Sequence, residues 1–157
     1  MRGSATFDRT GRYRYRLARR WGAGPCIAFV MLNPSAADAA KDDPTVRRCL
    51  GFARRWGFGA LEVVNLFAYR AADPRELARE RNPVGPENDR SVARALRRAR
   101  LIVLAWGASR LARRRAGAVI ALVGDRPAYC LGRTKTGMPR HPLYLRASIR
   151  PTRFRGG

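Results

Sequence analysis

The sequence predicts an α/β fold: a three-layer α/β/α sandwich with a mainly parallel four-stranded sheet plus an N-terminal edge strand. Apolar runs of strand length alternate along the chain with segments of helical periodicity, and turn signals separate them. Because parallel strands are joined by right-handed crossovers, this alternation favours a parallel sheet with helices on both faces. The length of 157 residues fits one domain, which we expect to span residues 1–157.

The expected edge strand covers residues 11–21, where aromatic or apolar residues alternate with arginines. The alternating residues are Arg12, Tyr13, Arg14, Tyr15, Arg16 and Leu17. A period of two is typical of a half-exposed strand, because successive side chains point to opposite faces of a sheet. The pattern therefore predicts a row of arginines on one face, where they could contact phosphate groups.

Four further strands form the predicted parallel part of the sheet. They are Cys26–Leu32, Leu61–Phe67, Leu101–Trp106 and Arg126–Leu131. The first is continuously apolar, as expected of a strand that is buried on both faces, and it ends at the turn residues that begin with Asn33.

Helix-start signals place helices between these strands. Asp43 followed by Pro44 combines an acidic N-cap with a proline at the first helical position, which predicts a helix that continues to about Trp56. A short helix is expected after Pro74. Two longer helices are predicted over residues 86–98 and 108–121.

The charge of the chain points to a polyanionic partner. Lys and Arg number 33 against 11 Asp and Glu, so the formal net charge is +22, while the hydrophobic content of 46% is that of a folded protein. Only Lys41 and Lys135 are lysines, which indicates a codon bias toward arginine but does not explain the excess of charge. We therefore expect a nucleic acid, DNA before RNA, or a nucleotide as the partner.

Several classes of protein are not indicated. The N-terminal segment lacks the pattern of a secretory signal, and no apolar run reaches the length of a membrane span, so a cytoplasmic protein without a membrane partner is expected. Cys26, Cys49 and Cys130 have no metal-ligand spacing, and we expect reduced thiols, no metal and no cofactor. Phosphate-loop, dinucleotide-binding and nucleophile-elbow motifs do not occur.

Polar residues gather where the predicted strands end. They are Asn33, Pro34, Ser35, Asn65, Trp106, Gly107 and His141. Ligands of parallel α/β sheets bind outside the carboxyl ends of the strands, so these residues are candidates for a substrate site. His141, held between Arg140 and Pro142, could donate a hydrogen bond to developing negative charge, or it could be a surface histidine that packs beside Tyr144.

Three of these positions have competing structural roles. Asn33 could orient a water molecule, or it could bond its own turn, and Ser35 could contact an anion or belong to that turn. Asn65 lies in an apolar strand and could read a nucleobase edge, or it could bond a neighbouring loop. Asp38 is the candidate general base, whereas Asp43 is expected to cap a helix and to lie near the substrate.

Five segments together closely resemble an uncharacterised bacterial and phage family, domain of unknown function 1643. They are LNPSAADAAKDDPTVRRC, NLFAYRAADP, NPVGPENDR, AWG and LGRTKTGMPRHPLYL. The resemblance extends from Tyr13 to Leu145 and implies no established activity.

A more distant resemblance connects the chain with the uracil-DNA glycosylase superfamily. Asn33-Pro34-Ser35 is similar to the motif after its first core strand, and His141-Pro142-Leu143 to its late His-Pro motif. Val63-Val64-Asn65 and Leu104-Ala105-Trp106-Gly107 are similar to its base-reading and third-strand segments. The resemblance implies a uracil-DNA glycosylase-like fold.

It also implies roles for individual residues. Asn33 would position water, Asn65 would read a base, and His141 would stabilise negative charge on the departing base. Leu143 or Tyr144 would fill the space of a flipped nucleotide. The expected function is nucleobase recognition on DNA or a nucleotide, with N-glycosidic hydrolysis as the reaction.

Two alternatives stay open. The chain could be a non-catalytic nucleic-acid binder, in which the arginine row and the loop that carries Arg133, Lys135 and Arg140 grip phosphates. It could also be an enzyme that acts on a small nucleotide or another metabolite.

Overall fold

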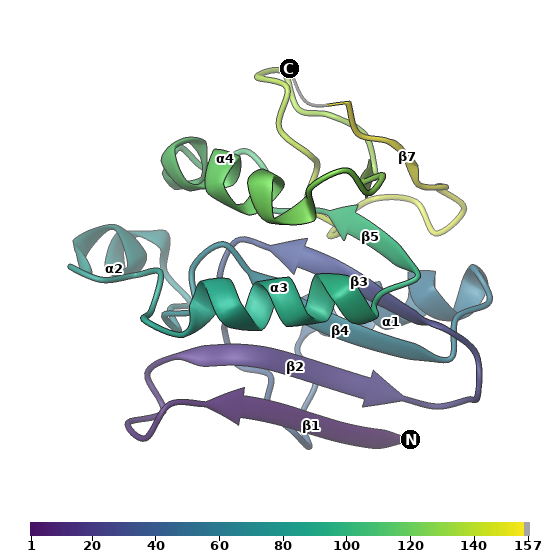
Figure 1. Cartoon of the computed structure of the whole chain (residues 1–157), viewed down its shortest axis with the longest axis horizontal. Helices are drawn as coiled ribbons and strands as arrows, with labels where there is room; N and C mark the ends of the chain where they lie inside the picture. The colour runs from purple at the N-terminus through teal and green to yellow at the C-terminus, as the bar shows by residue number, and fades with distance from the viewer. Residues whose placement is uncertain (156–157) are drawn as a thin grey trace.

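A computed structural model describes residues 1–155, and this part of the chain forms seven strands and four helices around one mixed sheet (Figure 1). The elements are β1 (Arg2–Phe7), β2 (Arg14–Arg20), β3 (Cys26–Met31), α1 (Pro44–Arg55), β4 (Ala60–Asn65), α2 (Pro74–Arg79), α3 (Asn88–Arg98), β5 (Leu101–Leu104), α4 (Leu111–Val123), β6 (Tyr129–Cys130) and β7 (Thr152–Arg153). The strand order in the sheet is β1-β2-β4-β3-β5-β6-β7. The α/β class that the sequence predicts is confirmed.

Parallel pairing is confined to the middle of the sheet. β3 pairs in parallel with β4 and with β5, and β5 pairs in parallel with β6. β1 and β2 at one edge, and β7 at the other, add antiparallel pairs. The parallel strands are the ones that helices connect, as expected of crossover connections.

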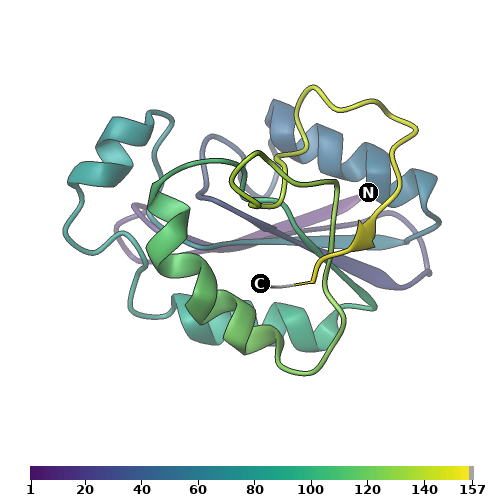
Figure 2. The ribbon, with the colours of Figure 1, turned by 90° about the horizontal axis from the view of Figure 1, so that it is seen from above.

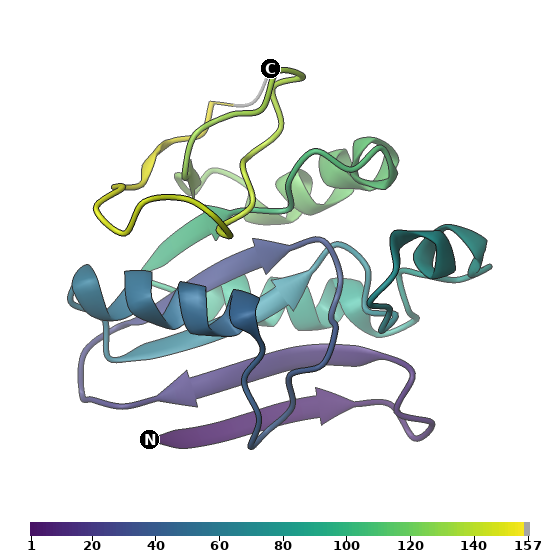
Figure 3. The ribbon, with the colours of Figure 1, turned by 180° about the vertical axis from the view of Figure 1, so that it is seen from behind.

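Helices cover both faces of the sheet. Figure 1 shows α3 and α4 in front of the strands, and Figure 3, seen from behind, shows α1 on the opposite face. In the view from above, α1 and the α3–α4 pair lie on either side of the strands (Figure 2). Two apolar clusters fill the space, one between α1 and the sheet around Phe29 and Phe52, the other under α3 and α4 around Leu96 and Leu104.

The helix-start signals are confirmed at two helices. Asp43 caps α1, where its side chain accepts a hydrogen bond from the backbone N–H of Val46, and a proline occupies the first turn. α2 begins at Pro74 after an aspartate cap in the same way. None of the helices in residues 1–155 combines the length and apolar character that crossing a membrane requires.

Other predicted boundaries were wrong by a few residues. α3 begins at Asn88 rather than at residue 86, α4 covers residues 111–123 rather than 108–121, and β5 ends two residues before Trp106. The fourth predicted strand is reduced to two residues. Pro127 has no N–H to donate to a ladder, and the side chain of Arg126 binds the end of α3 instead.

The prediction for the N-terminal strand was wrong in two respects. The edge of the sheet is β1, which the sequence analysis did not predict, and β2 lies between β1 and β4. A β-bulge also interrupts the alternation, because the neighbours Thr6 and Phe7 pair with Arg16 and Arg14, which leaves Tyr15 as an extra residue. The bulge turns Arg14 to the face that α1 covers, away from Arg16.

Candidate functional site

A cavity of about 130 Å³ lies at the carboxyl ends of β3 and β4, on the side of the sheet that α1 covers. Its walls consist of Arg14, Met31, Leu32, Asn33, Pro34, Ser35, Asp43, Thr45, Val46, Val63, Asn65, Trp106 and His141. Most residues that the sequence singles out for the site therefore meet in one place. The reason is topological, since the ends of parallel strands share one edge of the sheet.

Asn33 lies two residues after the end of β3, and its amide is held in one orientation. Its Nδ2 donates to the carbonyl oxygen of Ala71 at 2.7 Å and to that of Pro34 at 3.1 Å. The two hydrogens of the amide are thus committed to the backbone, so Oδ1 is the atom that Asn33 can offer to a ligand or water. The bond to its own turn and the capacity to orient water coexist in one side chain.

Asn65 is the last residue of β4 and only 1% exposed. Neither its Nδ2 nor its Oδ1 has a hydrogen-bond partner among residues 1–155. A buried polar group without a partner costs about 1–3 kcal/mol, so an unpartnered amide in a cavity wall is expected to serve a ligand.

The backbone of Asn65 is fixed by a second buried asparagine. Asn88, at the start of α3, donates its Nδ2 to the carbonyl oxygen of Asn65 at 2.9 Å and to that of Leu66 at 3.0 Å. Sequence reasoning did not single out Asn88, whose only signal is a polar residue at the first turn of an amphipathic helix. The contact leaves the side chain of Asn65 free while it anchors the end of β4.

His141 is held as a neutral imidazole with a defined tautomer. The backbone N–H of Leu143 donates to its Nδ1 at 3.2 Å, so in the neutral ring the hydrogen belongs to Nε2. Burial lowers the pKa of His141, and the charge of Asp43 only partly opposes this shift. His141 can therefore donate a hydrogen bond from Nε2 without carrying a charge.

Trp106 and Gly107 follow β5 in the chain. Trp106 lines the cavity, and Gly107 lies against His141. Trp106 is 1% exposed, and its indole N–H points to Sδ of Met138 at 3.2 Å. Gly107 has a positive φ of 83°, and a Cβ at this position would meet Cβ of His141 at 3.4 Å. Glycine is favoured by the backbone conformation, whereas a Cβ would be at ordinary van der Waals distance from His141.

Arg14 is the residue that sequence reasoning assigned to the wrong environment. It is expected in an exposed row, but it is 2% exposed and lines the cavity. Its Nη1 donates to the carbonyl oxygen of Ala37 at 3.0 Å, whereas its Nε has no partner within residues 1–155. Burial lowers the pKa of Arg14 to about 10, against the opposing charge of Asp43.

Asp43 is the carboxylate of the cavity. Its Oδ1 accepts from Val46 N–H at 2.8 Å, and its Oδ2 accepts from Ala37 N–H at 3.3 Å. Thr45, in the first turn of α1, also lines the cavity, and sequence reasoning missed it. The expectation that Asp43 both caps α1 and lies at the site agrees with this geometry.

Asp38, the candidate general base, is not brought to the cavity. Its Oδ1 accepts hydrogen bonds from the backbone N–H groups of Ala40 at 2.9 Å and Lys41 at 2.7 Å, and these bonds lower the pKa of its carboxyl. The residue stabilises the turn before α1, because a short acidic side chain bonds the backbone two and three residues ahead.

The residues on either side of His141 in the chain do not belong to the cavity wall. Leu143 is half-buried, Arg140 is exposed, and Tyr144 is 98% exposed with a positive φ of 67°. Tyr144 is the only residue other than glycine with a positive φ among residues 1–155. A positive φ is uncommon for a residue that is not glycine and marks a locally strained backbone.

The basic residues do not form the expected continuous row. Arg12 and Lys135 are exposed, but Arg16 forms an ion pair with buried Glu62. Arg133 is exposed and donates to the carbonyl oxygens of Gly137 and Arg155.

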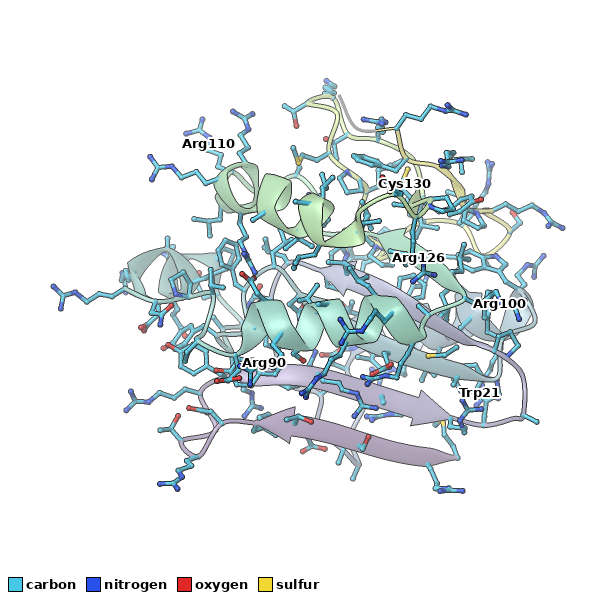
Figure 4. The ribbon with its side chains drawn as sticks, in the orientation of Figure 1. Trp21, Arg90, Arg100, Arg110, Arg126 and Cys130 are labelled. Atoms are coloured by element: carbon cyan, nitrogen blue, oxygen red, sulfur yellow. The ribbon has the colours of Figure 1, made fainter. Side chains whose placement is uncertain are left out.

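Other arginines line two open grooves, of about 800 and 580 Å³, on the side of β1 and β2 that faces α3. They are Arg2, Arg9, Arg16, Arg19, Arg20, Arg90, Arg94 and Arg98. Figure 4 shows Arg90 on α3 in this region, whereas Arg110 projects from the start of α4. Several of these arginines are already engaged within the protein, since Arg16 and Arg98 pair with Glu62 and Arg19 pairs with Asp42.

No group of three histidine, cysteine or acidic residues in residues 1–155 is arranged to hold a metal ion. The three cysteines are free. Burial raises the pKa of Cys26 to about 11 and raises that of Cys49 further, so neither thiol is poised as a nucleophile.

The chain belongs to the DUF1643 family of proteins of unknown function, whose model matches residues 14–143. The match covers every residue that lines the cavity. Neither the curated proteins nor the solved structures give a match.

Proposed function

We propose that the cavity binds one nucleobase of DNA or of a nucleotide, and that the protein hydrolyses the N-glycosidic bond of that base. The observation that carries the proposal is the unpartnered, buried amide of Asn65 in the wall of a cavity of about 130 Å³. This volume is close to the roughly 150 Å³ of an apolar cavity that binds benzene, so it is of the order of a single ring. A free amide supplies both a donor and an acceptor, which is the pattern that a nucleobase edge requires.

The cavity also holds the groups that such a hydrolysis needs. The bond between C1′ of the sugar and the base nitrogen breaks, and its electron pair moves into the base. The Nε2–H of His141 stabilises the negative charge that develops on a base oxygen. A water molecule held by Oδ1 of Asn33 adds its hydroxyl to C1′, while its other hydrogen goes to the base.

The arrangement of the motifs favours a uracil-DNA glycosylase-like, three-layer fold. Asn33, Asn65, Trp106 and His141 carry the resemblance to that superfamily, and all four line the same cavity. The parallel strands β3, β4, β5 and β6 and the helices on both faces are compatible with it.

A polynucleotide substrate is favoured by the charge of +22 and by Tyr144. An exposed aromatic side chain three residues after His141 could enter the stack when a base is flipped out. Non-catalytic binding is the weaker alternative, because Arg14 and Arg16 of the expected arginine row are engaged inside the protein.

The test measures abasic-site formation in oligonucleotides that contain uracil, a G·T mismatch or no lesion, single- and double-stranded, at two salt concentrations. We expect alkali-labile abasic sites with one of the lesions. Asn33→Ala and His141→Ala should each lower the rate about a hundredfold or more. Asn82→Ala is a matched control, because Asn82 is exposed and lies outside the cavity.

Each outcome separates the alternatives. Salt-sensitive binding without abasic sites would overturn hydrolysis and favour a nucleic-acid binder. Activity on a free nucleoside or nucleotide, with weak polynucleotide binding, would favour the small-molecule enzyme. Full activity in both cavity variants would show that the cavity is not the reaction site.

A further inference from the structure

Arg14 gives the cavity a property that recognition of a neutral base does not require. Its side chain is buried, it lines the same cavity as Asn65, and its Nε–H has no acceptor within residues 1–155. A buried guanidinium with an open donor is expensive unless an acceptor completes it, and a charged acceptor completes it best.

Among the charged groups that act directly on Arg14, two are guanidinium groups and one is a carboxylate. The positive charges of Arg19 and Arg70 repel the guanidinium of Arg14, whereas the carboxylate of Asp43 attracts it. Asp42 is engaged by Arg19 at 2.9 Å. Thr45 and Val46 of the cavity wall belong to the first turn of α1, whose N-terminus is the positive end of a helix dipole.

We propose that Arg14 makes the cavity selective for a nucleobase that carries a negative charge on its edge, as a carboxylate substituent or as an ionised ring nitrogen. The inference rests on the proposed nucleobase site and specifies its ligand class. Asn65 reads the donor and acceptor pattern of the ring, and the planar fork of Arg14 pairs with the anionic group.

The experiment compares free bases that carry a negative charge on their edge with neutral bases of similar shape. Dissociation constants of uracil, 5-carboxyuracil and 5-carboxamidouracil are measured by titration calorimetry at pH 7. The amide has nearly the shape of the carboxylate but is neutral and replaces one acceptor oxygen by an NH2 donor, so the ratio of their dissociation constants reports the preference for an anionic acceptor. We expect 5-carboxyuracil to bind about tenfold or more tightly than the amide. Binding of 5-nitrouracil, whose ring N–H ionises readily, distinguishes a ring anion from a carboxylate.

Variants assign the preference to Arg14. Arg14→Met should bind uracil and lose the preference for the carboxylate, and Arg14→Lys should keep part of it. Arg16→Met is the matched control, because Arg16 lies on the same strand but pairs with Glu62 outside the cavity. If Arg14→Met does not fold, the ratio of the dissociation constants of 5-carboxyuracil and 5-carboxamidouracil in the unmodified protein still tests whether the cavity prefers an anionic base.

Two negative results are distinguishable. Equal affinity for the carboxylate and the amide, with measurable uracil binding, would overturn the role of Arg14 and leave the nucleobase site intact. Absence of binding for all four bases would overturn the nucleobase site itself.

Discussion

The backbone N–H of Leu143 donates a hydrogen bond to Nδ1 of His141 at 3.2 Å. This contact between residues two positions apart fixes the tautomer of the ring, and it is lost when His141 is protonated, because Nδ1 then carries a hydrogen. The protonation state of one side chain is thus linked to the conformation of the loop that carries it.

Protonation of His141 should therefore destabilise the protein. Burial lowers the pKa of His141 in the folded state, so below about pH 6.5 the unfolded chain binds the proton more readily. The contribution of neutral His141 to the free energy of unfolding is fully present above that pH. It decreases as the pH drops toward the folded pKa, by no more than about 1.4 kcal/mol per pH unit. Urea unfolding at several pH values between 5 and 7.5 measures the slope.

The control for this pH dependence is His141→Asn, whose Oδ1 can accept the same backbone N–H. The variant should show a flatter profile between pH 5 and 7.5, where the carboxylates hardly titrate. An identical slope in both proteins would mean that another group is responsible.

The two buried asparagines should respond in opposite ways to removal of the amide. Asn65→Val removes a polar group without a partner, so the free energy of unfolding should stay the same or rise by about 1–3 kcal/mol, while nucleobase binding is lost. Asn88→Val removes two hydrogen bonds to the end of β4 and should lower the free energy of unfolding by about 1–3 kcal/mol. Thermal and urea unfolding give both values.

Loss of stability in Asn65→Val as large as in Asn88→Val would contradict this account. It would show that the amide of Asn65 has a structural role in the folded protein, and the argument for a ligand at that position would lose its basis.

Glu62 should contribute to stability in neutral solution and lose that contribution in acid. Burial raises the pKa of its carboxyl, but hydrogen bonds from Arg98 and Arg16 outweigh this effect and lower it overall. Its stabilisation is present above about pH 4.5 and is lost as the pH falls through the folded pKa. Glu62→Gln should cost about 1–3 kcal/mol at pH 7 and flatten the acid limb of stability.

The matched control is Glu76→Gln on α2, where the carboxylate is exposed. This variant should unfold within about 0.5 kcal/mol of the unmodified protein at every pH. An equal effect of both substitutions would argue that net charge, and not the ion pairs of Glu62, governs stability.

Tyr144 should be dispensable for folding and needed on duplex DNA. The backbone of Tyr144 has a φ of 67°, which is strained for a residue other than glycine. Tyr144→Gly should therefore leave the free energy of unfolding unchanged or raise it by up to about 1 kcal/mol. If the ring fills the space of a flipped base, activity should fall on double-stranded DNA and change little on single strands. Kinetics on both substrates measure this ratio.

Tyr144→Phe keeps the ring and should keep the activity on duplex DNA. Equal losses on single and double strands in Tyr144→Gly, or a marked loss of stability, would show that the residue acts on the shape of the loop instead.

The gathering of most candidate residues at one cavity could be predicted from the sequence, because these residues follow strand ends. Asn33 after β3, Asn65 at the end of β4 and Trp106 after β5 are placed together by the topology of a parallel sheet alone. Asp38 could not be separated from Asp43 in this way. Both follow β3, and only the turn that Asp38 stabilises shows that its carboxylate is occupied.

The sequence by itself determined the α/β class, the caps of α1 and α2 and the set of polar residues at the strand ends, since apolar periodicity and capping are local properties. Only the tertiary structure decided the fate of Arg14. The bulge opposite Thr6 and Phe7 depends on how β1 pairs with β2, and pairing between strands is not encoded in the alternation of one strand. That pairing turned a residue expected on the surface into a buried cation in the cavity.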